Sequence, residues 1–310
     1  MTEIDSEKSF LDLASEGRGG KWSYLISVIL GSIYYIVAGV ILFMAFLFIS
    51  TGGVYGESQI DESTGLIKNV DILLQYIAIN LSISPILVWV LLVTKFFHNR
   101  PIISLISATG KIRWSLVRQG FVVWLVLSVI SLIFEFFFYP SNIIFSLKPE
   151  KFFMQLPVVL LITPIQTSTE ELFFRGYILQ AQAFITKNIW VLAFFNGLLF
   201  LVPHMLNTEM KDYQFMMTII YFGIGFFLAY ITVKTNGMEA ALGAHAANNL
   251  FGLLVSFKKS SLPLESVFQT KEMHPVTDTI SFIIMAIVFC FVISKFYSQD
   301  RLKSDSDQNE

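Results

Sequence analysis

Apolar residues fill long blocks of this chain, and the blocks lack the alternation of apolar and polar positions that is typical of strands. A block of about 18 or more apolar residues is long enough to cross the hydrocarbon core of a bilayer as a helix. The pattern therefore predicts an all-α, polytopic transmembrane bundle of about eight spans. The predicted spans are Tyr24–Ser50, Ile72–Thr94, Phe121–Tyr139, Phe153–Ser168, Ile189–Leu206, Phe215–Val233, Ala240–Phe257 and Thr279–Ser294.

The amino-acid composition indicates the same class of protein. Apolar residues make up 55% of the 310 residues and charged residues only 14%, whereas soluble domains carry about 25% charged residues. This deficit argues against a soluble enzyme, a disordered chain and a nucleic-acid-binding protein. The formal net charge of −2 gives no reason to expect a polyanionic partner. The single cysteine, Cys290, excludes a disulfide framework and a cysteine-rich metal cluster.

The basic residues predict how the chain lies in the membrane. Of the 21 Lys and Arg residues, 14 fall at the termini and in the second, fourth and sixth connections, and 7 fall in the other connections. Basic residues concentrate on the cytoplasmic side of membrane proteins, so we expect both termini in the cytoplasm. The first span is too long for a cleaved signal peptide, and the lack of targeting segments favours a bacterial plasma membrane.

We divide the chain into four segments. Residues 1–22 form a cytoplasmic N-terminal segment, in which Ser9–Ser15 is expected to lie on the membrane surface as an interfacial helix. Residues 23–152 hold the first three spans, and residues 153–257 hold spans four to seven. Residues 258–310 hold a loop, the eighth span and a polar tail that is expected to be disordered.

Ionisable residues inside the apolar blocks need a specific reason, because each costs roughly 2.5–3.5 kcal/mol at the centre of a membrane. Glu135 stands alone in the third span, and we interpret it as a buried structural acid. The remaining such residues fall in three short patterns within spans four to seven. Two further histidines, His98 and His274, lie in polar connections and are expected to be solvated.

The first pattern is Glu170-Glu171 followed by Arg175. On a helix, Glu171 and Arg175 are i,i+4 neighbours and can form an ion pair. Glu170 points about 100° away from Glu171 around the helix and stays free for chemistry. A purely structural alternative is a helix start, because Thr167 and Ser168 each precede a glutamate by three residues, as in a capping box. That alternative accounts for only one of the two glutamates.

The other two patterns centre on histidines. His204 follows Pro203 near the end of the fifth span, and His245 and Asn249 share one face of the seventh span. The residues around His245 are small, which lets helices approach closely, so we expect His245 to face protein. The structural alternatives are a helix-end histidine bonded to a carbonyl group for His204 and an interhelical hydrogen bond for His245.

The positions of the two histidines along their spans place them at different depths in the membrane. His204 lies near the far end of its span, whereas His245 lies roughly 9 Å into the seventh span, at about 1.5 Å per residue. For the two side chains to meet, one span must be short, tilted or broken, and Pro203 favours a break. The site is expected to open toward the cytoplasm.

Together these residues could activate water for the hydrolysis of an amide bond. Glu170 would act as general base, His204 would orient the same water, and His245 and Asn249 would donate hydrogen bonds to the oxyanion. The same glutamate and two histidines could instead hold Zn²⁺ and leave a fourth position for water, although the His-Glu-x-x-His signature is absent. A proton or ion relay in a transporter is the third alternative.

The order Glu-Glu-x-x-x-Arg, Phe-x-x-x-His and His-x-x-x-Asn resembles the CPBP family, the CAAX-protease and bacteriocin-processing (Abi) group that includes the Rce1-type prenyl endopeptidases. The resemblance covers about Phe153 to Leu254. It implies an all-helical intramembrane protease that hydrolyses a peptide bond of a membrane-associated protein or peptide. The site residues that it implies are the catalytic Glu170, His204, His245 and Asn249 and the supporting Glu171 and Arg175.

The resemblance leaves the metal and the activity open. Family members are described both as metalloproteases and as metal-free enzymes, and we favour a reaction that requires no cofactor, because Asn249 is a better oxyanion donor than zinc ligand. In the zinc alternative, Glu170, His204 and His245 are the ligands. The alternative functions are a non-catalytic immunity or scaffold protein of the same family and a proton-coupled transporter, against which the lack of matching broken helices in two halves counts.

Overall fold

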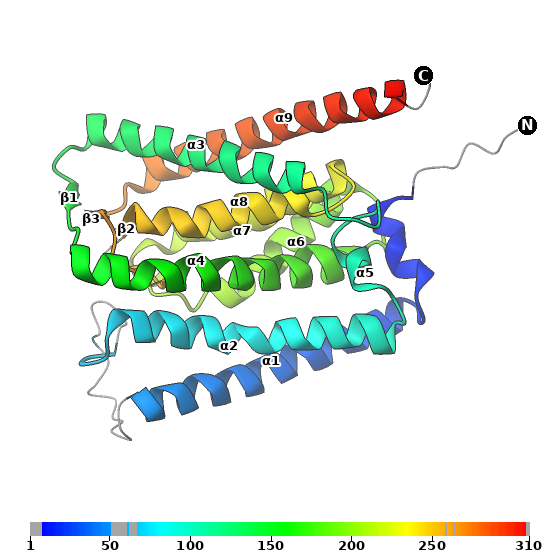
Figure 1. Ribbon diagram of the computed structural model, residues 1–310, viewed down its shortest axis with the longest axis horizontal. Coiled ribbons are helices and arrows are strands. Elements are labelled where there is room, and N and C mark those ends of the chain that lie inside the picture. Colours follow the sequence, from blue (N-terminus) through cyan, green and yellow to red (C-terminus); the bar gives the residue numbers. More distant parts are fainter. Residues whose placement is uncertain (1–7, 51–60, 62–66, 258, 263, 308–310) are drawn as a thin grey trace, which may run out of the picture.

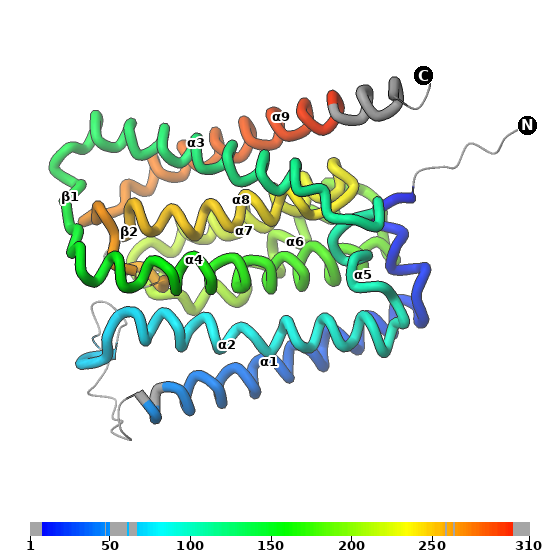
Figure 2. Tube along the Cα trace, viewed as in Figure 1, coloured from blue at the N-terminus to red at the C-terminus, as the bar shows by residue number. Residues whose placement is uncertain are grey.

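The computed structural model describes residues 8–50, 61, 67–257, 259–262 and 264–307. Its helices run back and forth along one axis as a single bundle, and both ends of the chain lie at the same end of it (Figures 1 and 2). The predicted all-α polytopic bundle is therefore confirmed. The α-helices are α1 (Lys21–Ser50), α2 (Ile72–Leu92), α3 (Trp114–Phe138), α4 (Pro149–Glu171), α5 (Leu179–Gln182), α6 (Ile189–His204), α7 (Met210–Lys234), α8 (Glu239–Leu250) and α9 (Pro275–Asp307).

Six helical stretches of the described chain are long and apolar enough to cross a membrane, as expected of a multi-pass membrane protein. They are Lys21–Phe46, Ile72–Phe97, Trp114–Phe138, Pro149–Gln182, Met210–Lys234 and Pro275–Gln299. The other two predicted spans are shorter, because α6 has 16 residues and α8 has only 12. α8 contacts α3, α4 and α7 inside the bundle, so protein contacts rather than bilayer thickness set its length.

The fourth predicted span extends well beyond Ser168. α4 continues through a π-helical segment, Leu172–Ile178, directly into α5. The helix begins at Pro149, and Thr167 lies inside it with its hydroxyl donating to the carbonyl oxygen of Thr163 at 3.0 Å. This back-bonding is usual for a threonine in a helix interior. The capping-box interpretation is therefore wrong, because no helix starts at these residues.

Glycines allow α3 and α8 to approach each other closely. A Cβ atom at Gly243 would lie 2.0 Å from the carbonyl oxygen of Val117, and one at Gly120 would lie 2.2 Å from that of Ala240. Only residues without a side chain fit at such a contact. The contact holds α8 inside the bundle, where His245 is 5% exposed, so the prediction that His245 faces protein is confirmed.

A small sheet lies at the end of the bundle opposite the two termini (Figure 1). Its strands are β1 (Ile143–Phe145), β2 (Val255–Phe257) and β3 (Phe268–Thr270), in the order β1-β3-β2. β1 pairs with β3 antiparallel, and β2 pairs with β3 parallel. The predicted seventh span therefore ends early, because its last three residues form β2 instead of helix.

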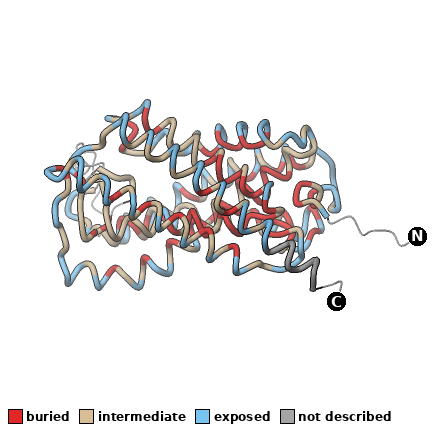
Figure 3. Tube along the Cα trace, turned by 90° about the horizontal axis from the view of Figure 1, so that it is seen from above, coloured by how far each residue is buried: buried red, intermediate tan, exposed pale blue. Residues whose placement is uncertain are grey.

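The N-terminal segment packs into the bundle. Phe10–Glu16 forms a 3-10 helix whose Phe10 and Leu13 are buried against α5, α6 and α7, whereas the sequence led us to expect a helix on the membrane surface. It covers the end that holds the termini, and Figure 3 shows buried positions gathered in that half of the molecule. At the other terminus α9 continues through residues 304–307 of the expected disordered tail, and residues 308–310 lie outside the described chain.

Candidate active site

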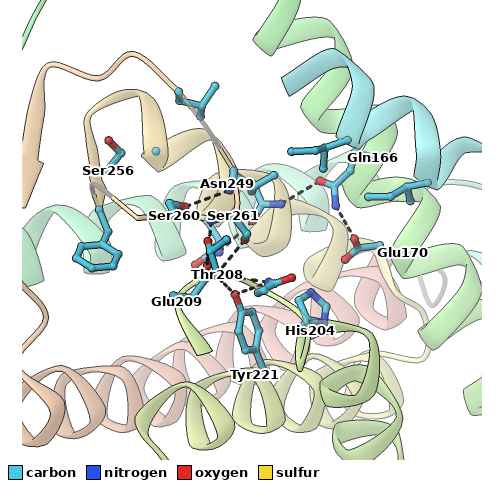
Figure 4. Close-up of a pocket in the computed structure, with 18 of the residues that line it drawn as sticks. Gln166, Glu170, His204, Thr208, Glu209, Tyr221, Asn249, Ser256, Ser260 and Ser261 are labelled. Atoms are coloured by element: carbon cyan, nitrogen blue, oxygen red, sulfur yellow. Dashed lines mark hydrogen bonds between the residues drawn. The ribbon is translucent and has the colours of Figure 1, made fainter. Parts of the chain in front are cut away.

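A cavity of about 490 Å³ lies within the bundle, a volume within the range of small-ligand sites. Glu170 of α4, His204 at the end of α6, and His245 and Asn249 of α8 all line it. Figure 4 shows Glu170, His204 and Asn249 on its wall. The structure thus brings together the four residues that the three motifs single out.

The two histidines meet because their helices are short. α6 has 16 residues and ends at His204, one residue after Pro203, so it reaches only part of the way across the bundle. α8 has 12 residues, and His245 lies in its middle. Both side chains therefore reach the same cavity without a break in either helix.

Glu170 carries a carboxylate oxygen that is free to act. Its side chain is 13% exposed. Its Oε1 accepts a hydrogen bond from Gln166 Nε2 at 2.6 Å, whereas its buried Oε2 has no hydrogen-bond partner in the described chain. His245 Nε2 lies 3.6 Å from that Oε2, beyond hydrogen-bond distance. An acceptor position on Glu170 is therefore left for another molecule at the cavity wall.

Glu171 holds two buried partners at once. Its Oε1 lies 2.7 Å from Arg175 Nη1, and both side chains are fully buried, so the predicted i,i+4 ion pair is confirmed. The same Oε1 lies 2.7 Å from His245 Nδ1. Because a carboxylate paired with a guanidinium only accepts hydrogen bonds, His245 Nδ1 carries a proton. Its Nε2 is then the nitrogen that faces Glu170.

His204 is fixed by its own helix and by two aromatic rings. Its Nδ1 donates to the carbonyl oxygen of Phe200 at 2.7 Å, since a carbonyl oxygen can only accept. The imidazole lies between the rings of Phe200 and Tyr221, with ring centroids 4.4 Å from each. The carbonyl bond of the structural alternative is present, yet Nε2 stays available to the cavity.

Gln166 is a site residue that the motifs miss. Its Nε2 donates to Glu170, and its Oε1 accepts from Asn249 Nδ2 at 3.0 Å, so it links the two predicted residues across the cavity (Figure 4). Its position one helical turn before Glu170, on the same face of the helix, was the signal available in the sequence. Asn249 keeps a second amide N–H, because its side chain has two donors.

Glu209 and Tyr221 were also missed, and they organise the sheet-side part of the cavity. Tyr221 donates its hydroxyl hydrogen to the Glu209 carboxylate, which is buried. Glu209 also accepts from the backbone N–H of Ser261 at 2.9 Å and from the Ser261 hydroxyl at 3.0 Å. The network ties the turn after α6 to the loop after β2, and long-range pairing of this kind leaves no local pattern in the sequence.

Two histidines were misjudged, because the residues that surround them are distant in sequence. His98 is buried rather than solvated: its ring stacks on Tyr24 at 3.9 Å, and its Nε2 lies 2.6 Å from the Tyr177 hydroxyl. Burial lowers the pKa of His98 below its ordinary value. His274 is half-buried and stacks on Tyr139 at 3.7 Å.

Glu135 is half-buried near the C-terminal end of α3, where its carboxylate accepts from Asn142 Nδ2 at 2.9 Å. It does not line the cavity. This placement fits the structural role expected for it.

The geometry does not form the zinc site of the alternative mechanism. Among the described residues, no three His, Cys, Asp or Glu side chains are close enough to share a metal ion. The hydrogen bonds at the Nδ1 atoms of His204 and His245 leave both Nε2 atoms, as in many metal-binding histidines, so the distances between the side chains decide the question. Glu170, His204 and His245 line one cavity, but in this arrangement the three side chains are too far apart to share one ion.

Comparison with known proteins bears on the segment that carries the motifs. Residues 149–251 match the family described as "Type II CAAX prenyl endopeptidase Rce1-like". The chain is 29% identical over 293 residues to a protein of Bacillus subtilis (strain 168) named "Uncharacterized protein YyaK", and the match covers 93% of this chain and 96% of that protein. No solved structure matches the chain.

Proposed function

Since residues 149–251 match the family described as "Type II CAAX prenyl endopeptidase Rce1-like" and the motifs resemble the CPBP group, we propose that the protein is an intramembrane endopeptidase. Its substrate is a membrane-associated protein or peptide, and its reaction is the hydrolysis of one peptide bond. The observation that carries this proposal is the buried Oε2 of Glu170, which has no hydrogen-bond partner among the described residues, on the wall of a cavity that His204 and His245 also line.

In the proposed reaction, Glu170 and His204 bind one water molecule. The water donates one hydrogen bond to Glu170 Oε2 and the other to the unprotonated Nε2 of His204. As its oxygen attacks the carbonyl carbon, Glu170 takes one of its protons as general base, and the carbonyl electron pair moves to the oxygen. That electron pair then re-forms the carbonyl group as the C–N bond breaks, and Glu170 gives its proton to the leaving nitrogen. The new carboxyl group passes the second water proton to the amine, so a carboxylate and an ammonium group are released.

His245 and Asn249 stabilise the oxyanion in this mechanism. Asn249 donates the N–H that Gln166 does not use. His245, whose ring Glu171 orients through Nδ1, donates from Nε2.

Replacement of Glu170 tests the proposal. We expect Glu170→Gln, purified in detergent, to lose cleavage of membrane peptides by at least about 10²-fold, the lower end of what a general base contributes, while its thermal unfolding midpoint is retained. Glu16→Gln, which removes a half-exposed carboxylate paired with Lys8 far from the cavity, is the matched control. Wild-type cleavage by Glu170→Gln, or a cellular phenotype that survives it, would favour a non-catalytic role.

We also propose that the termini are cytoplasmic and that the cavity opens on the opposite side of the membrane. The connections richer in Lys and Arg lie at the end that holds the termini, whereas the cavity is lined by residues of the α6–α7 turn, β2 and the following loop, at the sheet end. This differs from the cytoplasmic opening that the sequence led us to expect.

Cysteine labelling of intact cells tests this orientation. In a Cys290→Ser background, a membrane-impermeant maleimide is expected to label Ser260→Cys at the sheet end. Lys187→Cys, at the end that holds the termini, is expected to be labelled only after the membrane is permeabilised. The reverse pattern would place the cavity mouth in the cytoplasm.

A further inference from the structure

We propose that β2 binds the substrate peptide as an added strand, an inference that rests on the peptidase function proposed above. β2 is an outer strand of the β1-β3-β2 sheet. Its three residues, Val255–Phe257, all line the catalytic cavity, and no residue of β1 or β3 does. The sheet therefore presents to the cavity one strand edge that no other strand of the described chain covers.

The pairing with β3 shows which backbone groups of β2 face away from the sheet. The N–H of Phe268 in β3 donates to the carbonyl oxygen of Leu254 at 2.9 Å. In a parallel ladder, alternate residues of a strand direct their N–H and C=O groups to the same side. Ser256 therefore faces β3 as Leu254 does, and Val255 directs its backbone groups to the opposite edge.

Phe257 has the same orientation as Val255, two positions earlier. Its carbonyl oxygen accepts from the N–H of Ser260 at 3.0 Å, so of its two backbone groups on the open edge only the N–H is left to bind a peptide. Val255 offers both an N–H and a C=O. These three groups have the alternating order that an extended peptide needs in order to pair with a strand edge.

The open edge lies within reach of the proposed catalytic groups. Val255 follows Asn249 by six positions, a path of roughly 9–12 Å at the rise of about 1.5–2.0 Å per residue of α- and 3-10 helices. An extended peptide covers that distance in about three to four residues. In Figure 4, Ser256 and Glu170 lie on opposite sides of Asn249, so a peptide paired with β2 would lead toward Glu170.

An extended conformation is also what the chemistry requires. In a helix, each backbone carbonyl accepts a hydrogen bond from the N–H four residues further on, so the peptide bond is not open to attack by water. A strand edge binds an unwound segment through main-chain hydrogen bonds and places few demands on its side chains. The proposed ligand is therefore a peptide that is anchored in the membrane, and the part of it that binds β2 is an extended segment outside the membrane anchor.

A proline substitution in β2 tests the strand. Phe257→Pro removes an N–H on the open edge, and the residue before it, Ser256, lies in the strand with the extended backbone that proline requires and keeps its pairing with β3. Phe257→Leu keeps that N–H and is the control for the lost ring. The probe is a quenched-fluorescence decapeptide with a C-terminal dodecyl chain, selected from a randomised library by wild-type cleavage. We expect KM to rise about two- to tenfold, the effect of one lost hydrogen bond, with kcat within about twofold.

Ile143→Pro in β1 is the matched control. The N–H of Ser146 donates to the carbonyl oxygen of Val267, and that of Lys271 donates to the carbonyl oxygen of Asn142. Asn142 and Ser146 therefore face β3, and Ile143 faces outward on the edge away from the cavity. We expect the KM of this variant to match the wild type, although it carries the same kind of backbone change.

A scan of the substrate makes the test independent of how the variants fold. N-methylation of single backbone nitrogens of the selected peptide should raise KM at alternate positions only, because a paired strand directs alternate N–H groups to its partner. An unchanged KM for Phe257→Pro together with a scan that shows no alternation would overturn the strand. A wild-type protein that cleaves no peptide of the library would contradict the peptidase function itself.

Discussion

Replacing Glu171 should lower both the thermal stability of the protein and its peptidase activity. The two effects have different causes and can be measured separately. Its Oε1 lies 2.7 Å from both Arg175 Nη1 and His245 Nδ1, in a fully buried position. Glu171→Leu leaves a buried guanidinium without its carboxylate, and such a loss costs about 3–5 kcal/mol. At about 2 °C per kcal/mol for a chain of this size, the thermal unfolding midpoint should fall by roughly 6–10 °C.

The double variant Glu171→Leu/Arg175→Met separates the two roles. Replacing both members of a buried ion pair by apolar residues of similar volume is often neutral for stability, so the unfolding midpoint should return to within a few degrees of the wild type. Peptide cleavage should remain low by about 10²–10⁴-fold, because His245 has lost the carboxylate that accepts from its Nδ1 and so fixes the orientation of its ring.

Both quantities are measured on one detergent preparation, the midpoint by thermal unfolding and the rate with a cleaved peptide. The control is Arg113→Met/Glu239→Leu, which removes another buried ion pair, 2.6 Å long, at the start of α8 outside the cavity. It should retain cleavage within about threefold. Cleavage at the wild-type rate by Glu171→Leu/Arg175→Met would refute the positioning role, and an unchanged midpoint in Glu171→Leu would refute the stability argument.

Three further outcomes are expected. Gly243→Val should lower the folded yield and the thermal unfolding midpoint, because the added Cβ would lie 2.0 Å from the carbonyl oxygen of Val117. Gly20→Ala is the control: its added Cβ would have no atom within 4 Å, so the midpoint should not change in the same assay. Burial lowers the pKa of His98, so below about pH 6.5 the unfolded state binds more protons than the folded state, and the free energy of unfolding should fall as the pH drops. This dependence on pH should be weaker in His98→Gln. A dependence that persists in this variant would show that another group causes it. Cleavage should survive EDTA, and elemental analysis of active protein should show less than one zinc per chain; chelator-sensitive activity restored by zinc would contradict the metal-free reaction.

The sequence was informative about the site wherever function depends on neighbours along one helix. Glu171 and Arg175 lie four residues apart, so the 3.6-residue period alone predicts their pairing. The same local reasoning missed the 2.7 Å contact between Glu171 and His245, which joins residues 74 positions apart. His98 was misjudged for this reason too, since its stacking partner Tyr24 belongs to another helix.

The sequence by itself determined that this protein lies in a membrane and which residues make up its candidate site. Long apolar blocks require a membrane, and the few ionisable residues inside them require a reason, because burial of charge is costly in any fold. Only the tertiary structure decided where these residues meet. The lengths of α6 and α8, the glycine contact between α3 and α8, and the free edge of β2 depend on packing between distant segments, and a hydrophobicity pattern does not encode such contacts.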